Sequence, residues 1–321
     1  MGRLRVGRRR VVRRSRRRTP GTDRAGRGSV TVALPVASVP TATASPVVTL
    51  APATSVPGLA GAPGPSGTPA PSRRLLPARR LGTPSPNATV VRRIDLGPTM
   101  ARFALDPDEE PQPIRPGQYV AIGLERDGRI IQRPYSVASS AAEAWLDFAI
   151  RLVPGGALTP ALWRLGPGDR VRIGPPRGLF GLSEGDPRTH LLLATGTGIA
   201  PLVAMARSLH ASAAPPRTVI VHGVARVEEL AYAAELGAWA GGHAGWRYVP
   251  AISRPTDPSN VAWRGPVGRL DVVVPAVLDD LRLDPSDAVA YVCGSPDMIH
   301  GLSRGLVALG MPASAVRSEA Y

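Results

Sequence analysis

The sequence of 321 residues predicts an antiparallel β-barrel followed by a doubly wound α/β domain with a parallel sheet, preceded by a disordered extension. Three observations predict this fold class. The composition changes near residue 80, short strands separated by Pro-Gly turns fill 88–182, and apolar strands alternate with helices after residue 187. We expect boundaries at 1–85, 86–185 and 186–321.

The extension carries the net charge of the chain. The first 80 residues hold 16 arginines, one acid (Asp23) and no aromatic residue, whereas the remaining 241 hold 23 arginines and 23 acids, so the formal charge of +15 belongs to the extension. Residues 19–80 are rich in Pro, Ala, Thr, Ser and Gly without periodicity. Such a composition buries too little apolar surface to offset the entropy of ordering a chain.

Three interpretations of the extension remain open. It is a basic arm for nucleic acid or anionic lipid, an acid-poor targeting peptide, or a stretch upstream of the start used in the cell. The chain has no lysine beside its 39 arginines, and a bias towards arginine codons would produce such runs without selection for charge. This favours the last interpretation, and we rest no function on the extension.

The barrel is predicted from short strands separated by Pro-Gly pairs at 116–117, 154–155 and 167–168. One helix is expected at Ala161–Leu165, with Thr159 as its N-cap and Pro160 at the first helical position. The expected strands are Ala88–Arg93, Met100–Leu105, Gln118–Leu124, Ile130–Val137, Trp145–Val153 and Arg170–Ile173. Six strands in so short a segment are typical of a small antiparallel barrel.

The second domain is predicted from apolar strands bounded by helices, the pattern of a parallel sheet covered on both faces. The expected strands are His190–Ala194, Thr218–His222, Arg247–Ile252 and Ala288–Cys293. The expected helices are Pro201–His210, Val227–Leu236, Asp271–Leu281 and Pro296–Leu309.

Residues 191–201 combine an apolar strand, a turn containing Gly196, Thr197 and Gly198, and a helix start at Pro201. Glycines let a diphosphate approach the backbone, and a helix N-terminus offers free N–H groups. The turn departs from the usual dinucleotide fingerprint, because Pro201 occupies the third glycine position. A plain strand-to-helix turn is the structural alternative.

Residues 133–140, RPYSVASS, lie at the end of a predicted barrel strand. The guanidinium of Arg133 can bind a diphosphate, the ring of Tyr135 can pack on an aromatic ligand, and the hydroxyl of Ser136 can donate a hydrogen bond to a ring nitrogen. The alternative is an ordinary strand end with an exposed arginine.

Several classes of protein and site are excluded or disfavoured. One cysteine, Cys293, cannot supply a disulfide framework, a four-cysteine zinc site or a plant-type iron–sulfur cluster. The five histidines show no ligand pair, so we expect no metal. The sequence has no stretch of 18 apolar residues, so we expect no membrane-spanning helix. Ser295 lies in Gly-Ser-Pro rather than in a nucleophile elbow, so hydrolase chemistry is not supported.

The order of six motifs resembles the plant-type ferredoxin–NADP(+) reductases, in their bacterial ferredoxin/flavodoxin reductase branch. The resemblance covers about 86–321. The motifs are Pro116-Gly117-Gln118-Tyr119, Arg133-Pro134-Tyr135-Ser136, Gly155-Gly156-Ala157-Leu158-Thr159-Pro160, Gly196-Thr197-Gly198-Ile199-Ala200-Pro201, Val292-Cys293-Gly294-Ser295-Pro296 and the terminal Glu319-Ala320-Tyr321.

The resemblance implies that the barrel binds FAD and the second domain binds NADP(H). It implies a catalytic set of Ser136, Cys293, Glu319 and Tyr321. It implies FAD contacts from Arg133, Pro134, Tyr135, Ser136, Ile150, Leu152, Ala157, Leu158, Thr159 and Tyr321. It implies NADP contacts from Gly196, Thr197, Arg226, Ser253, Arg254, Arg269 and Cys293, although Arg226 stands one place later than the commonest bacterial spacing.

The activity that the resemblance implies is hydride transfer between NADP(H) and FAD, and single-electron transfer between FAD and a ferredoxin or flavodoxin. An NAD(P)H-dependent flavin or ferric reductase, or an oxygenase reductase component, is the enzymatic alternative. Nucleic-acid binding through the basic arm is the non-enzymatic one. We expect a cytoplasmic monomer without a stable nucleic-acid or membrane partner.

Overall fold

The computed structural model describes residues 85–321 except 111 and 184, and these residues belong to one compact unit, Leu75–Tyr321. The predicted extension, with its proposed basic arm, lies outside the described residues. The first half is built from six strands: β1 (Ala88–Gly97), β2 (Met100–Pro107), β3 (Tyr119–Arg126), β4 (Arg129–Ser136), β5 (Leu146–Arg151) and β6 (Arg170–Ile173). Every paired neighbour is antiparallel, in the order β4-β3-β6-β1-β2-β5.

The core of this half is formed by side chains from one face of each strand. Phe103, Phe148, Ile122 and Val171 come from four different strands and are all buried. Successive strand residues point to opposite faces, so Leu146, Phe148 and Ile150 of β5 enter this core while the residues between them face outward. The predicted antiparallel barrel is confirmed.

The short helix of the barrel begins earlier than predicted. Helix α1 spans Thr159–Leu162, and Leu158 rather than Thr159 is its N-cap residue. The hydroxyl of Thr159 instead accepts a hydrogen bond from the backbone N–H of Val153 at 2.9 Å. This bond fixes the Gly155-Gly156 turn against the end of β5.

The second half is a parallel sheet of β7 (Thr189–Thr195), β8 (Thr218–Val224), β9 (Trp246–Ile252), β10 (Ala288–Gly294) and β11 (Val316–Ala320), in the order β11-β10-β7-β8-β9. Its helices are α2 (Ile199–His210), α3 (Ala233–Gly242), α4 (Leu270–Asp280) and α5 (Pro296–Ala308). All four strand pairs are parallel, as the alternation of strands and helices predicted.

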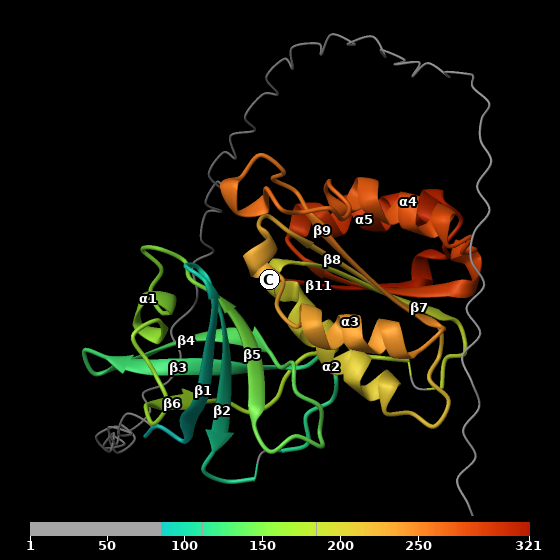
Figure 1. The fold of residues 1–321 in the computed structure, drawn as a ribbon. Helices are drawn as coiled ribbons and strands as arrows, with labels where there is room; N and C mark the ends of the chain where they lie inside the picture. Colours follow the sequence, from blue (N-terminus) through green and yellow to red (C-terminus); the bar gives the residue numbers. More distant parts are fainter. Residues whose placement is uncertain (1–84, 111, 184) are drawn as a thin grey trace, which may run out of the picture. The chain divides into compact units, whose positions relative to one another are not determined.

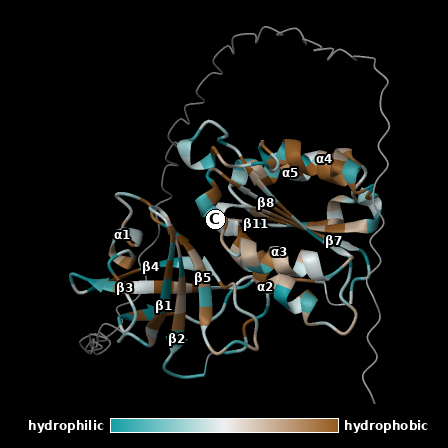
Figure 2. Cartoon of the chain, in the orientation of Figure 1, coloured by the Kyte–Doolittle hydropathy of each residue, from teal (hydrophilic) through white to brown (hydrophobic). Residues whose placement is uncertain are grey.

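Helices cover both faces of the parallel sheet (Figure 1). Leu192 and Ala194 of β7 pack with α2 and the start of α3, whereas Leu191 and Leu193 pack with α4 and α5. The middle of each central strand is accordingly hydrophobic (Figure 2). The predicted doubly wound domain is confirmed.

Two elements of this half differ from the prediction. The helix expected at Val227–Leu236 is instead a three-residue 3-10 turn, Val227–Glu229, followed by α3 from Ala233. Tyr232 separates them with a left-handed φ of 64°, a conformation that interrupts a helix. The strand β11 was not predicted, and it pairs with β10 so that Glu319 lies opposite Cys293.

The outward face of β5 contacts the α/β half. Asp147 pairs with Arg102 and lies 3.8 Å from Arg207 of α2. Arg207 also binds Glu143 at 3.0 Å and Glu235 of α3 at 2.8 Å. A buried charge needs an oppositely charged partner, because the loss of its hydration otherwise costs several kcal/mol. This cluster of ion pairs fixes β5 against α2, and so positions the residues that follow on β5.

Among the helices of 85–321, apart from the two omitted positions, none combines the length and hydrophobicity that a membrane span requires. The same residues contain no group of three His, Cys, Asp or Glu side chains placed to hold a metal ion.

Candidate active site

The strand order puts a crevice at the carboxyl ends of β7 and β10. The chain runs outward from β7 through β8 to β9, then returns to the other side of β7 with β10, and ligands of such sheets bind where the order reverses. The turn Gly196–Gly198 follows β7 here, directly before α2, and Cys293 lies near the end of β10. The glycine turn and the cysteine motif of the sequence are thus neighbours.

Gly198 makes the closest approach between these two strands. A Cβ atom at this position would lie 2.4 Å from the carbonyl oxygen of Cys293 and 3.1 Å from Cε1 of Tyr321. Only a glycine fits, so the turn after β7 packs directly on the backbone of β10. Gly196 adopts a φ of 53°, a second reason for glycine in this turn.

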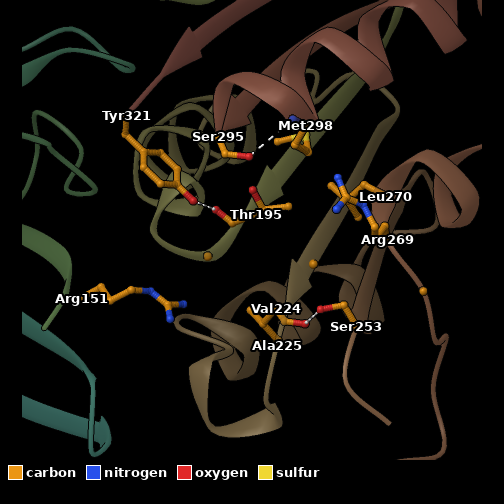
Figure 3. Close-up of a pocket in the computed structure, with 13 residues that line it drawn as sticks. Arg151, Thr195, Val224, Ala225, Ser253, Arg269, Leu270, Ser295, Met298 and Tyr321 are labelled. Carbon is orange, nitrogen blue, oxygen red and sulfur yellow. Dashed lines mark hydrogen bonds between the residues drawn. The ribbon is translucent and has the colours of Figure 1, made fainter. Parts of the chain in front are cut away.

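Two pockets open at this point of the structure. The larger, pocket A, has a volume of about 490 Å³. Its lining residues are Arg133, Pro134, Tyr135, Ser136, Ala149, Arg151, Val153, Gly156, Ala157, Leu158, Thr159, Thr197, Gly198, Ala200, Cys293 and Tyr321. The smaller, pocket B, has a volume of about 250 Å³ (Figure 3). Its lining residues are Arg151, Thr195, Gly196, Gly223, Val224, Ala225, Ser253, Gly268, Arg269, Leu270, Ser295, Met298 and Tyr321.

Arg151 and Tyr321 line both pockets. The hydroxyl of Tyr321 donates a hydrogen bond to the carbonyl of Thr195 at 3.0 Å, which holds the terminal ring over the glycine turn (Figure 3). The guanidinium of Arg151 binds the carboxylate of Glu229 at 3.0 Å. These two side chains therefore stand at the junction of the pockets.

Most of the predicted FAD residues meet in pocket A, but two do not. Ile150 is 1% exposed and its side chain lies in the barrel core, because it shares the inward face of β5 with Phe148. Leu152 is half-buried and its backbone N–H donates to the carbonyl of Thr99. Ala149, Arg151 and Val153, which alternate with them along the strand, line pocket A, so a contact of Ile150 or Leu152 with FAD stays a prediction.

The predicted NADP residues divide between the pockets. Gly196, Ser253 and Arg269 line pocket B, and Thr197 and Cys293 line pocket A. Arg226 and Arg254 line neither. Arg254 follows Ser253 and its side chain is exposed. Arg226 forms an ion pair with Asp257, with its Nε 2.8 Å from the carboxylate.

Three residues at the junction of β10 and β11 have altered acidity. Burial, together with the nearby charge of Glu319, raises the pKa of Cys293 to about 12. Burial also raises the pKa of Glu319, and the hydroxyl of Ser136 partly offsets this by hydrogen bonding. The pKa of Tyr321 is raised by burial as well. At neutral pH, Cys293 is a neutral thiol and Tyr321 a neutral phenol.

We expect the thiol of Cys293 to resist alkylation. Since only the thiolate reacts, a pKa of about 12 in place of 9.0 slows iodoacetamide at pH 8 by roughly a thousandfold, before any steric protection. Mass spectrometry after one hour should show unmodified native protein and a single adduct on the denatured chain. Rapid modification of the native protein would contradict this burial.

The sequence reasoning missed Arg151, Glu229 and Thr195. Arg151 had a recognisable signal, because it is the one charged residue at the end of an otherwise apolar stretch, Phe148–Arg151. Glu229 had none, since its burial at 1% exposure depends on contacts with a distant strand.

Comparisons with known proteins agree with this geometry. The protein-family model described as an oxidoreductase FAD-binding domain matches residues 87–181, and the oxidoreductase NAD-binding domain matches 192–304. A ferredoxin–NADP reductase B from Sorangium cellulosum is 34% identical over 212 residues, which cover 64% of this chain and 84% of that protein. The chain belongs to the plant-type ferredoxin–NADP(+) reductase family.

Other members widen the range of functions within this family. The reductase subunit of an aromatic O-demethylase from Amycolatopsis is 33% identical over 222 residues, covering 66% of this chain and 62% of that protein. A ferredoxin NADP+ reductase from Neisseria gonorrhoeae, solved with bound FAD and NADP, superposes with a TM-score of 0.63 at 22% identity, covering 73% of this chain and 97% of that one. This last likeness concerns the fold.

The family fixes the general activity of the chain. It is an oxidoreductase that uses FAD and a nicotinamide dinucleotide, and the predicted cofactors FAD and NADP(H) are confirmed at the level of its two domains. The domain boundaries 86–185 and 186–321 stay predictions, because each family model matches only part of the corresponding range.

Proposed function

We propose that this protein transfers hydride between NADP(H) and FAD, and single electrons between FAD and a ferredoxin or flavodoxin. The observation that carries the proposal is the junction of pockets A and B, where Arg151 and Tyr321 line both cavities and Cys293 lies at the end of β10. Two adjoining cavities at one sheet edge suit two cofactors that must meet.

Pocket A fits FAD by the chemistry of its lining. Its apolar wall, with Ala149, Val153 and Leu158, suits a flat ring system, and Arg133 supplies a guanidinium at the edge for a diphosphate. Tyr135 offers an aromatic face beside that wall, and Ala157–Thr159 present backbone N–H groups at the start of α1. Bound FAD would supply the step between two-electron and one-electron transfer.

Pocket B suits the dinucleotide. Gly196 of the glycine turn lines this pocket, and the absence of a side chain there lets a diphosphate approach the backbone. Ser253 and Arg269 line the far end of the pocket (Figure 3), and Arg254 follows directly. These positive groups favour a 2′-phosphate and therefore NADP(H) over NAD(H).

The residues at the junction shape and desolvate the reacting region. Tyr321 must move aside from Thr195 to admit a nicotinamide ring, because its side chain covers the glycine turn. Cys293, as a neutral thiol, packs against the ligand without adding charge. Glu319 lies opposite Cys293 in the β10–β11 register, and burial raises the pKa of its carboxyl group.

We expect the purified protein to be yellow and its flavin absorbance to bleach with NADPH faster than with NADH. Anaerobic stopped-flow spectroscopy measures both rates, and deletion of residues 1–80 should leave them unchanged. Reoxidation by an added ferredoxin or flavodoxin tests the second half of the reaction. A colourless protein that cannot be reconstituted with FAD would contradict the proposal.

A second candidate is the reductase component of an oxygenase. The likeness to the O-demethylase reductase subunit and to the electron transfer component of a toluate 1,2-dioxygenase, 30% identical over 197 residues, favours it. The sequence has one cysteine, too few to bind an iron–sulfur cluster. Reoxidation rates with a ferredoxin and with a direct oxygenase partner distinguish the candidates.

A further inference from the structure

Four side chains of alternating charge run beside pocket B. Arg151 binds Glu229 at 3.0 Å, Glu229 lies 3.8 Å from Arg226, and Arg226 binds Asp257 at 2.8 Å. Glu229 is 1% exposed, while the side chains of Arg226 and Asp257 are 32% and 19% exposed. Two arginines near the nucleotide pocket are thus neutralised by two carboxylates.

Asp257 is held rigidly in this chain of charges. Its carboxylate accepts hydrogen bonds from the backbone N–H and the hydroxyl of Ser259, at 3.1 and 2.8 Å. These bonds, with the one from Arg226, lower the pKa of Asp257. Asn260, three residues further along the chain, fixes this segment because its side-chain amide donates hydrogen bonds to the carbonyls of Ala225 and Arg254. The carboxylate therefore cannot swing away without breaking several contacts.

The ion pair of Arg226 and Asp257 adjoins residues that line pocket B. Ala225 and Ser253 line the pocket, and each is followed along the chain by an arginine, Arg226 and Arg254. Figure 3 shows Ala225 and Ser253 side by side, across from Arg269. A phosphate at this end of the pocket would meet the positive charge of Arg269. The guanidinium of Arg226 is less available, because its Nε already donates a hydrogen bond to the carboxylate of Asp257.

We propose that Asp257 is a specificity-determining residue, which weakens discrimination between NADPH and NADH by holding Arg226 away from the 2′-phosphate. A fixed carboxylate repels the phosphate and occupies donors that would otherwise bind it. A ribose 2′-hydroxyl carries no charge and suffers no such repulsion. This inference rests on the proposed function of pocket B as the dinucleotide site.

The test is Asp257→Asn, which keeps an oxygen to accept from Ser259 but removes the charge. We expect the holoenzyme variant to bind 2′-phospho-AMP about fivefold more tightly by calorimetry, the effect of one partly exposed charge at short range, with AMP binding unchanged. The ratio of kcat/KM for NADPH to that for NADH should rise by a similar factor. In the double variant D257N/R226Q this gain should disappear, because it requires the freed guanidinium.

The matched control is Asp108→Asn, which removes the partner of Arg170 on the barrel, and there we expect no change in either ligand. Unchanged or weaker binding of 2′-phospho-AMP by D257N would overturn the inference. Weaker binding would mean that Asp257 positions Arg226 to bind the phosphate. If neither dinucleotide reduces the flavin of the wild-type protein, the proposed function fails first.

Discussion

Gly198→Ala is expected to lower the rate of flavin reduction by NADPH about 100-fold while the protein still binds FAD. The added Cβ would lie 2.4 Å from the carbonyl oxygen of Cys293 and 2.7 Å from its carbonyl carbon, so backbone must move. The φ of Gly198 is −60°, which any residue adopts, and steric overlap is therefore the whole cause. A displacement of about 1 Å between reacting groups costs roughly this factor.

The effect should fall on the chemical step and on dinucleotide binding together. The turn carries Gly196 and Thr197 at the junction of the pockets, whereas most residues of pocket A come from the barrel and do not move with it. Single-turnover stopped-flow measurements at several NADPH concentrations separate the two contributions. Flavin content, read from the absorbance spectrum, reports whether the barrel half remains intact.

Gly301→Ala is the control for this substitution. Gly301 lies inside α5 and a Cβ there would meet nothing within 4 Å. Alanine in a helix interior is favoured over glycine by about 1 kcal/mol, so this variant should be slightly more stable and equally active. A G198A protein with wild-type reduction kinetics would contradict the close contact between the turn and β10.

The sequence predicted ten of the eleven strands described between residues 85 and 321, because their limits are set locally. Pro-Gly pairs end strands through their own backbone preferences, and apolar runs identify a sheet buried on both faces. The helix expected at Val227–Leu236 failed for a tertiary reason. Tyr232 packs under the guanidinium of Arg102, 4.0 Å from its ring centroid, and takes a left-handed conformation there.

The sequence predicted where the site lies, but not which of its charged residues form ion pairs. Motif order located the glycine turn, Cys293 and the terminal Tyr321, because the carboxyl ends of neighbouring parallel strands meet at one edge. The resemblance pointed to the strand that ends at pocket A, but the side chains that line the pocket are those of Ala149 and Arg151, which alternate with the predicted Ile150 and Leu152. The pairing of Arg226 with Asp257, 31 residues apart, depends on how two loops pack and has no local signal.

The second large effect that we expect is a loss of stability on acidification that depends on His222. Its ring is fully buried in β8, and Nε2 lies 3.0 Å from the carbonyl of Gly196, so Nε2 donates there and Nδ1 has no partner among the described residues. A second proton would place a charge on the buried Nδ1. Burial accordingly lowers the pKa of His222 from 6.5 to about 4.

The sign of the effect follows from proton binding in the two states. Between pH 6.5 and about 4 the unfolded chain holds a proton on this histidine and the folded protein does not. The free energy of unfolding therefore falls as the pH falls through this window, by about 3 kcal/mol in total. His190, whose pKa is also lowered by burial, contributes in the same direction. Denaturant titrations at pH 7, 6, 5 and 4.5 measure the sum.

His222→Gln isolates the contribution of His222. The glutamine amide can still donate to the carbonyl of Gly196 but cannot titrate, so the variant should be less stable at pH 7 and lose less stability towards pH 4.5 than the wild type. His300→Gln, on the exposed face of α5, should keep the wild-type pH dependence. His190 and the carboxylates are the same in the variant and the wild type, so their contributions cancel in the comparison. An H222Q protein with the full wild-type pH dependence would show that His222 titrates alike in the folded and unfolded states. Such a result would contradict a buried, neutral ring beside the glycine turn.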